Sequence, residues 1–378
     1  MINVYSSKHE SLNSIIKQIF LDFDLLKQKK VFIKPNLGGR CPIIKGENTR
    51  YDVLRNLCKV LEENGCQEIV IGHGSLLNFG KAGYDFEALL INSNFYKLSK
   101  YKIVRFLNLD NADKTIVKVK DITFTIPDIC RTHFYINLCN VKTHMETTVS
   151  LSLKNQVGLL PQNERMRKHQ TNLDKHIALL GVAVKPHLII TDGRVGMEGN
   201  GPHHGTPKHA DMILCGDDMV EVDSLICRLM GIDFESVGHI KFAMEEKVGY
   251  YVSEKQYSAY KQYSVKFRPP DEFYGKYRHI RVWPNKACSA CIFNLSDAHK
   301  AIRKNPVKLI KFINKLVKSK KFDIILGKGA EVNARKYSND ILVIGNCAED
   351  FVKFKNLSNY LPGCPPSKES IINFLLKG

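Results

Sequence analysis

The segment Val31-Phe32-Ile33-Lys34-Pro35-Asn36-Leu37-Gly38-Gly39 joins a short apolar run to a loop of proline and glycine, as a buried strand does where it ends. Four more runs have this character: Glu68–Ile71, Phe134–Leu138, Leu188–Thr191 and Met212–Leu214. Between them lie stretches with the apolar spacing of helices, at Leu54–Asn64 and Leu173–Val184. This alternation predicts an α/β protein with a mostly parallel sheet and helices on both faces.

The loops after the strands are the candidate sites, because ligands bind beyond the carboxyl ends of the strands in such sheets. The first loop carries Lys34 and Asn36. Lysine supplies charge and a glycine-containing loop can present N–H groups, so this segment suits an anion. A surface lysine at a strand end explains it equally well. The next strand leads to His73, for which a solvated loop position is the simpler interpretation.

A third strand runs into Lys142, Thr143 and His144, and a polar stretch up to Lys154 and Asn155 follows. If residues 147–155 are helical, Thr147, Ser150 and Lys154 share one face. The lysines and hydroxyls would then bind a carboxylate or phosphate in the same cleft. His144 would be available for proton transfer near neutral pH.

A fourth loop is rich in glycine and contains Asp192, Glu198 and Asn200. Two acids and an amide in such a loop favour a functional role over a purely structural one. We therefore expect catalytic roles for His144, Lys142, Asp192 and Glu198, and substrate contacts from Lys34, Asn36, Lys154, Asn155 and Asn200.

The character of the chain changes near residue 241. We expect an α/β domain over residues 1–240, a connecting segment over 241–286, and a smaller C-terminal α/β unit over 287–378. The C-terminal unit contains helical stretches at Leu295–Lys304, Val307–Lys321 and Lys368–Lys377, and strand-like runs at Ile324–Leu326 and Ile341–Ile344.

Four cysteines of this unit stand in loop contexts. Cys288 and Cys291 form a CxxC pair at the start of a predicted helix, Cys347 follows a strand, and Cys364 lies in a turn rich in proline and glycine. Four thiolates with amides nearby suit a 4Fe-4S cluster, and we expect these residues to be its ligands. Zinc is the main alternative, since it also accepts four thiolates.

The remaining seven cysteines are Cys41, Cys58, Cys66, Cys130, Cys139, Cys215 and Cys227, mostly inside apolar runs. We interpret them as small buried hydrophobic residues. Residues 1–18 lack the pattern of a signal peptide, and the apolar runs are too short to span a bilayer, so we expect a cytoplasmic protein without a transmembrane segment.

The net charge is 56 − 38 = +18, which favours anionic partners. We expect an anionic small-molecule substrate and consider an acidic electron-transfer protein as a further partner. The basic stretch Lys304–Lys321 would dock such a protein or a membrane surface, although a solvated helix face also explains it. Nucleic acid is not expected, because aromatic residues do not alternate with the basic ones.

The motifs taken together resemble the domain of unknown function 362 family. The matching segments, in order, are Ile33–Asn36, Val141–His144, Ser152–Asn155 with Gly158, Asp192-Gly193 with Met197–Pro202, and Gly216-Asp217 with Val222-Asp223, spanning roughly residues 28–235. Many members look like iron–sulfur proteins, often through an appended ferredoxin-type unit with two clusters. This chain lacks the closely spaced ferredoxin cysteines, so the resemblance implies one cluster in a different setting.

Three functions fit these observations. The first is an iron–sulfur oxidoreductase acting on an anionic substrate. The second is a lyase that uses the cluster as a Lewis acid, against which the four cysteine ligands count, because that chemistry normally leaves one iron without a thiolate. The third is a binding or electron-carrier module without catalysis.

Overall fold

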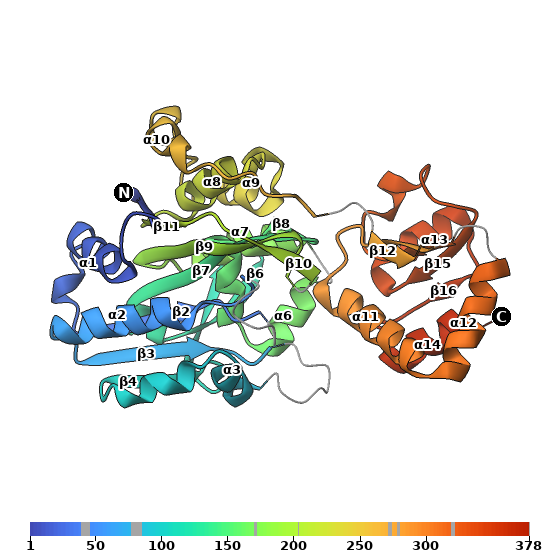
Figure 1. Cartoon of the computed structure of the whole chain (residues 1–378), viewed down its shortest axis with the longest axis horizontal. Coiled ribbons are helices and arrows are strands. Elements are labelled where there is room, and N and C mark those ends of the chain that lie inside the picture. The colour runs from blue at the N-terminus through green and yellow to red at the C-terminus, as the bar shows by residue number, and fades with distance from the viewer. Residues whose placement is uncertain are drawn as a thin grey trace. The chain divides into compact units, whose positions relative to one another are not determined.

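The computed structural model describes residues 1–38, 46–76, 85–169, 172–202, 204–270, 274–277, 280–318 and 322–377 (Figure 1). The chain divides into two compact units, Met1–Pro270 and Asp271–Gly378. Within the described ranges, no helix combines the length and the apolar character needed to cross a membrane.

The first unit is built on a large sheet. Its strands are β1 (Ile2–Ser6), β2 (Lys30–Pro35), β3 (Glu68–His73), β4 (Val104–Asn108), β7 (Phe134–His144), β8 (Thr148–Val149), β9 (Leu188–Asn200), β10 (His204–Lys208) and β11 (Met212–Gly216), and β5 (Lys114–Val119) and β6 (Ile122–Pro127) form a separate hairpin. Its α-helices are α1 (Leu12–Asp22), α2 (Tyr51–Glu63), α3 (Phe86–Asn92), α4 (Ile129–Thr132), α5 (Ser152–Asn155), α6 (Gln162–His169), α7 (Leu173–Ala183), α8 (Met219–Met230), α9 (Gly238–Glu245) and α10 (Glu254–Tyr260). The 3-10 helices are η1 (Leu25–Lys27), η3 (Phe95–Lys100), η4 (Gln156–Leu159), η5 (Phe234–Ser236) and η6 (Lys261–Tyr263).

The sheet has the order β1-β11-β9-β7-β2-β3-β4. The strands from β9 through β7, β2 and β3 to β4 are parallel to one another, while β11 pairs with β9, and β1 with β11, in the antiparallel sense. The predicted mostly parallel sheet is therefore confirmed. In β2 the register sets Lys34 opposite Asn137 of β7, so the carboxyl end of β2 lies beside the middle of the longer strand.

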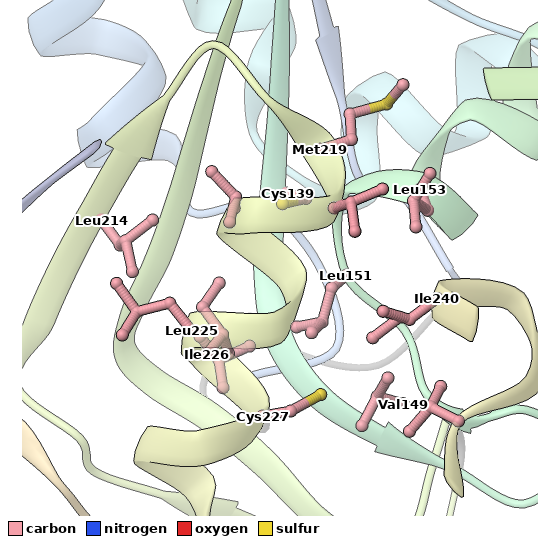
Figure 2. Close-up of a cluster of buried hydrophobic side chains, with 14 of the residues drawn as sticks. Cys139, Val149, Leu151, Leu153, Leu214, Met219, Leu225, Ile226, Cys227 and Ile240 are labelled. Carbon is pink, nitrogen blue, oxygen red and sulfur yellow. The ribbon is translucent and has the colours of Figure 1, made fainter. Parts of the chain in front are cut away.

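Alternating side chains of the strands enter two different cores. Ile33 of β2 and Ile190 of β9 pack with α1 and α2, whereas Phe32 packs on the opposite face with α7. Helices α8 and α9 cover that opposite face beside β11 (Figure 1). Figure 2 shows Leu225 and Ile226 of α8 near Leu214 of β11 in the hydrophobic cluster that these helices form with the sheet. The predicted helices on both faces are thus confirmed.

The second unit contains a sheet in the order β12-β13-β14-β15-β16, parallel from β13 to β16. Its strands are β12 (Tyr274–Tyr277), β13 (Ile280–Trp283), β14 (Phe322–Ile325), β15 (Asp340–Ile344) and β16 (Tyr360–Leu361). Its helices are α11 (Ser289–Lys304), α12 (Pro306–Lys318), η7 (Ala330–Asn333), η8 (Asn346–Ala348), α13 (Glu349–Lys355) and α14 (Lys368–Leu376). The expected α/β character of this unit is present, and residues 319–321 of the helix expected over 307–321 lie outside the described residues.

The segment expected to connect the domains, 241–286, is divided between the units. Its first part folds with the first unit: the backbone of Val265 bonds to Leu229, that of Phe267 bonds to Met230, and the Phe267 ring is buried in the core. Its last part supplies β12 and β13 to the second sheet. Val248 and Val252 are buried in the same core, so this part belongs to the first unit although its sequence shows no regular apolar period.

Candidate functional site

A buried lysine marks the carboxyl end of β2. Lys34 is fully buried, and its Nζ donates hydrogen bonds to the carbonyl of Pro35 at 3.1 Å and to Oδ1 of Asn155 at 3.2 Å. Within the described residues no carboxylate forms an ion pair with this ammonium. Burial, reinforced by the charges of Arg165 and Lys142, lowers the pKa of Lys34 to about 7.

Amide side chains connect Lys34 to a second lysine. Asn36 donates from Nδ2 to Oδ1 of Asn155 at 3.0 Å, and its own Oδ1 accepts a 2.6 Å bond from Lys142 Nζ. Lys142 also donates to the carbonyl of Glu47 at 2.9 Å. Burial lowers the pKa of Lys142 to about 8, against the opposing effect of Glu47. Lys34, Asn36, Lys142 and Asn155 thus form one hydrogen-bonded group, which we call the lysine–amide cluster.

His73 and Arg165 adjoin this cluster, and neither was selected from the sequence. His73, expected to be solvated, is instead buried at the end of β3, with Nδ1 donating to the carbonyl of Gly74 at 2.5 Å. Burial and then the Lys34 charge lower the pKa of His73 well below its usual value. A methyl group placed on Gly158 would lie 2.8 Å from Lys34 Nζ and 3.3 Å from His73 Nε2, so both groups face this glycine. The position of His73 beside a strand end was the signal that could have selected it.

Arg165 approaches from α6. Its guanidinium donates to the carbonyl of Ser75 at 2.6 Å and lies 3.5 Å from Asp110. Its Nε is buried and donates a hydrogen bond to no acceptor in the described part of the chain. Arg165 lies on a polar helix with no feature that distinguished it in the sequence, so only the tertiary structure identifies it.

Lys154 contributes a further cation. Its Nζ donates to Thr147 Oγ1 at 3.0 Å, although residues 147–155 do not form the continuous helix that was considered. They form the short strand β8 and the helix α5 instead, because residues 148–149 pair with the end of β7. Burial lowers the pKa of Lys154 to about 7, with Glu146 opposing the shift and Lys142 adding to it.

Five basic groups therefore influence one another: Lys34, His73, Lys142, Lys154 and Arg165. The acids that adjoin them are Glu47 near Lys142, Glu146 and Asp174 near Lys154, and Asp110 near Arg165. Taking a cation out of water is unfavourable unless an anion compensates for the lost hydration. The arrangement favours an anionic ligand beside Lys34 most strongly, since that ammonium has only neutral acceptors.

His144 and the glycine-rich loop lie further along the same strands. His144 is buried, and its Nδ1 accepts a bond from the backbone N–H of Glu146 at 3.1 Å. Thr143 donates to the carbonyl of Gly199 at 2.7 Å, which joins the β9–β10 hairpin carrying Asn200 to the end of β7. In this hairpin Glu198 accepts a 3.0 Å bond from the backbone N–H of Arg268.

Asp192 has different surroundings. It is fully buried, and both its oxygens accept hydrogen bonds from Arg194, at 3.0 and 2.9 Å. Arg194 also bridges to Asp52 of α2. Because β9 alternates its side chains, Asp192 lies on the face covered by α1 and α2, while Lys34 lies on the other face. The expectation that Asp192 and Lys34 line one cleft is therefore wrong for this pair.

The four C-terminal cysteines come together within the second unit. A hydrogen bond with Cys288 and burial raise the pKa of the Cys291 thiol, and Cys347 and Cys364 act on it in the same direction. The loops of the last two are joined, since the N–H of Asn346 donates to the carbonyl of Gly363 at 3.0 Å. A methyl group placed on Gly345 would lie 3.5 Å from Cys291 Sγ.

This neighbourhood matches a thiolate-bound group in its donor chemistry, because four cysteines and loop amides are what such groups use. As they stand, no three or more His, Cys, Asp or Glu side chains of the described ranges are arranged to hold a metal ion. The six scattered cysteines that the structure describes are buried as expected, and Cys41 lies outside the described residues.

Comparisons with known proteins concern mainly the first unit. The family model described as "Domain of unknown function (DUF362)" matches residues 31–228, just over half of the chain, which includes the lysine–amide cluster and excludes the four C-terminal cysteines. The thylakoid-associated protein sll1697 of Synechocystis is 27% identical over 120 residues, covering 30% of this chain and 37% of that protein. The chain thus matches well under half the length of this relative. A crystal structure of a Thermotoga maritima protein aligns over 52% of each chain with 13% identity and a TM-score of 0.30, a similarity too slight to bear on fold or function.

Proposed function

The chain belongs to the DUF362 family, and we propose that it is an iron–sulfur protein that oxidises or reduces an anionic small molecule bound at the lysine–amide cluster. A phosphate or a carboxylate is the group that this site would recognise. The observation that carries the proposal is the ammonium of Lys34, which is fully buried with only neutral hydrogen-bond acceptors.

Electrostatics support an anionic ligand. Each buried lysine of the site has a lowered pKa, so its protonation is less favourable in the unliganded protein than in water. An anion that enters the site stabilises the protonated lysines by pairing with them. Lys142 and Asn36 would orient the anion, since both are already held by hydrogen bonds and need little rearrangement.

Proton transfer is a second capability of these residues. With pKa values of about 7, Lys34 and Lys154 can hold or release a proton near neutral pH, which an ordinary surface lysine cannot do. We assign Lys34 as the group that exchanges a proton with the bound molecule. Lys142 has a pKa of about 8 and remains the more permanent positive charge.

The iron–sulfur part of the proposal rests on the thiol groups of Cys288, Cys291, Cys347 and Cys364. When bound, a 4Fe-4S cluster supplies single-electron transfer. The four thiolates would hold it, and the raised pKa of the Cys291 thiol means that this side chain favours the neutral form until a positively charged group is present. A cytoplasmic setting is part of the proposal, because cysteines without disulfides suit a reducing compartment.

Two measurements on anaerobically purified full-length protein test the iron–sulfur cluster and the anionic ligand separately. A broad visible absorption that dithionite bleaches, with roughly four iron atoms per chain and little zinc, supports the cluster. Stoichiometric zinc without iron contradicts it. Mass spectrometry of molecules released by denaturation tests the other half: a stoichiometric phosphate- or carboxylate-bearing compound is expected, and it should be absent from a Lys34→Met preparation.

A further inference from the structure

One helix of the second unit carries an unusual share of exposed apolar side chains. In the described parts of the chain, twelve large hydrophobic residues are exposed, and four of them belong to α12. These are Val307, Ile310, Ile313 and Val317, which are 65, 60, 45 and 79% exposed. A single exposed hydrophobic residue is ordinary on a protein surface, whereas four on one short helix indicate a binding surface.

The four residues form one stripe. Their spacings of three, three and four residues place them along one side of the helix. Another side already packs on the unit, because Phe312 is buried and its ring lies 6.4 Å from that of His299 on α11. Helix α12 is therefore anchored by one apolar side while a second apolar side, which we call the α12 stripe, faces solvent.

Lysines border the α12 stripe. Lys308, Lys311 and Lys315 recur at spacings of three and four residues, so they form a parallel row on the remaining side of the helix. Lys311 is exposed and Lys308 half-buried, while Lys315 is half-buried and donates to the carbonyl of Lys377. Between residues 300 and 321 the sequence contains nine lysines and arginines and no acid. The neighbouring surface is thus strongly positive along the length of the apolar stripe.

From these features we infer that α12 binds the surface of an anionic lipid bilayer. The α12 stripe would enter the boundary between headgroups and acyl chains, and the lysine row would lie against lipid phosphates. An exposed apolar stripe with a bordering row of lysines is the pattern of helices that lie in the plane of a membrane interface. Long lysine side chains can reach outward to the headgroups while the helix axis stays at that depth.

The combination of positive charge and exposed apolar surface favours a bilayer over a nucleic acid, an acidic protein or a second copy of this chain. A nucleic acid would pair with the lysines and leave the α12 stripe in water. An acidic protein would need a complementary apolar groove, and a second copy of this chain would bring two lysine rows toward each other. An anionic bilayer offers negative charge and an apolar layer along the whole helix.

The test is co-sedimentation of full-length protein with vesicles of phosphatidylglycerol and phosphatidylcholine, or of phosphatidylcholine alone. We expect binding to the anionic vesicles that weakens at high salt, and at least about tenfold weaker binding to the neutral ones. Lys308→Gln with Lys311→Gln should weaken anionic binding by about thirtyfold, since each lysine near such a surface contributes about 1 kcal/mol. Ile310→Asn with Val317→Asn should weaken binding by at least about tenfold at any salt concentration.

Matched controls exist in the first unit. Ile91→Asn changes an isoleucine of α3 that is 63% exposed, and Lys17→Gln removes an exposed charge from α1. Both should bind as the wild type does, and thermal unfolding of the four proteins checks that all are folded. Equal binding to both vesicle types, or unchanged binding by the Ile310→Asn/Val317→Asn protein, overturns the inference. The inference is also overturned if the wild type is a dimer that binds no vesicles and the Ile310→Asn/Val317→Asn protein is a monomer, because α12 would then be a protein interface.

Discussion

The Nζ atom of Lys34 and the Nδ2 atom of Asn36 donate to the same oxygen, Oδ1 of Asn155, at 3.2 and 3.0 Å. Asn155 is in turn held by its own donation to Asn137 at 2.7 Å. A residue of α5 thus fixes two residues at the end of β2, more than a hundred positions earlier in the chain. The cationic site depends on this contact between distant segments.

The burial of Lys34 predicts a pH dependence of stability. Its pKa of about 7 lies below the value of the unfolded chain, so the unfolded state binds more protons between pH 7 and about 10. The protonated lysine therefore destabilises the fold fully below pH 7, and this effect is relieved as the pH rises.

Lys34→Met should remove this contribution. The free energy of unfolding of the variant minus that of the wild type is expected to be positive at pH 6 and to decrease by about 1 kcal/mol per pH unit above pH 7. Urea denaturation across this range measures it, with the exposed Lys17→Met as the control. A difference that does not change with pH would contradict the pKa assigned to Lys34.

Gly158 predicts a steric effect on the site. An alanine there would bring its methyl group to 2.8 Å from Lys34 Nζ, so the ammonium must move. Gly158→Ala should lose anion binding while the unfolding free energy falls by only about 1–3 kcal/mol. Gly329→Ala is the control, because its methyl group would meet nothing closer than 3.7 Å. Equal ligand affinity in Gly158→Ala and the wild type would show that this glycine does not border the site.

The ion pair on the other face predicts an acid-dependent effect. Although burial opposes the shift, hydrogen bonds from Arg194 lower the pKa of Asp52 to about 2. This carboxylate therefore stabilises the fold above pH 4, and the stabilisation is lost as the pH falls toward 2. Asp52→Asn should lower the unfolding free energy by about 1–2 kcal/mol at pH 7, after allowance for solvent screening, and by less at pH 3.

A matched measurement uses Asp24→Asn, which removes a carboxylate from an exposed ion pair with Lys27 and should change little. If Asp52→Asn destabilises the protein equally at pH 3 and pH 7, the lowered pKa of Asp52 is refuted.

Because Asp192 also binds Arg194, we expect Asp192→Asn to reduce stability and leave anion affinity unchanged. That outcome would assign Asp192 a structural role in place of the predicted catalytic one.

The cysteines predict a pattern of iron content. Single Cys→Ala substitutions at Cys288, Cys291, Cys347 and Cys364 should each reduce the iron bound per chain severalfold, since each removes one of four ligands. The same substitution at the buried Cys58 or Cys227 should leave it unchanged, because those thiols lie in apolar cores of the first unit. Iron content and the visible spectrum measure both sets. Comparable iron loss in Cys227→Ala would mean that the loss reflects unfolding.

The sequence predicted those features that depend on local pattern. Short apolar runs such as Val31–Lys34 identified the strands, and the polar residues where these strands end identified Lys34, Asn36 and Lys142. His73 was misjudged because its burial depends on Gly158 and Lys34, which are distant in sequence. Arg165 was missed for the same reason. Asp192 was assigned to the cleft because spacing alone does not tell which face of the sheet a side chain occupies when its partner, Arg194, is unknown.

The central claim is that the buried cations bind an anion, and thermal unfolding with increasing orthophosphate, at constant ionic strength, tests it most directly. A ligand that binds only the folded state at a hundred times its Kd stabilises it by about 2.7 kcal/mol, so the unfolding midpoint of the wild type should rise by several degrees. A parallel series with acetate distinguishes a phosphate from a carboxylate site. We predict a rise with at least one of the two anions in the wild type and none in Lys34→Met. The same rise in both proteins, or no rise with either anion in the wild type, would contradict the account.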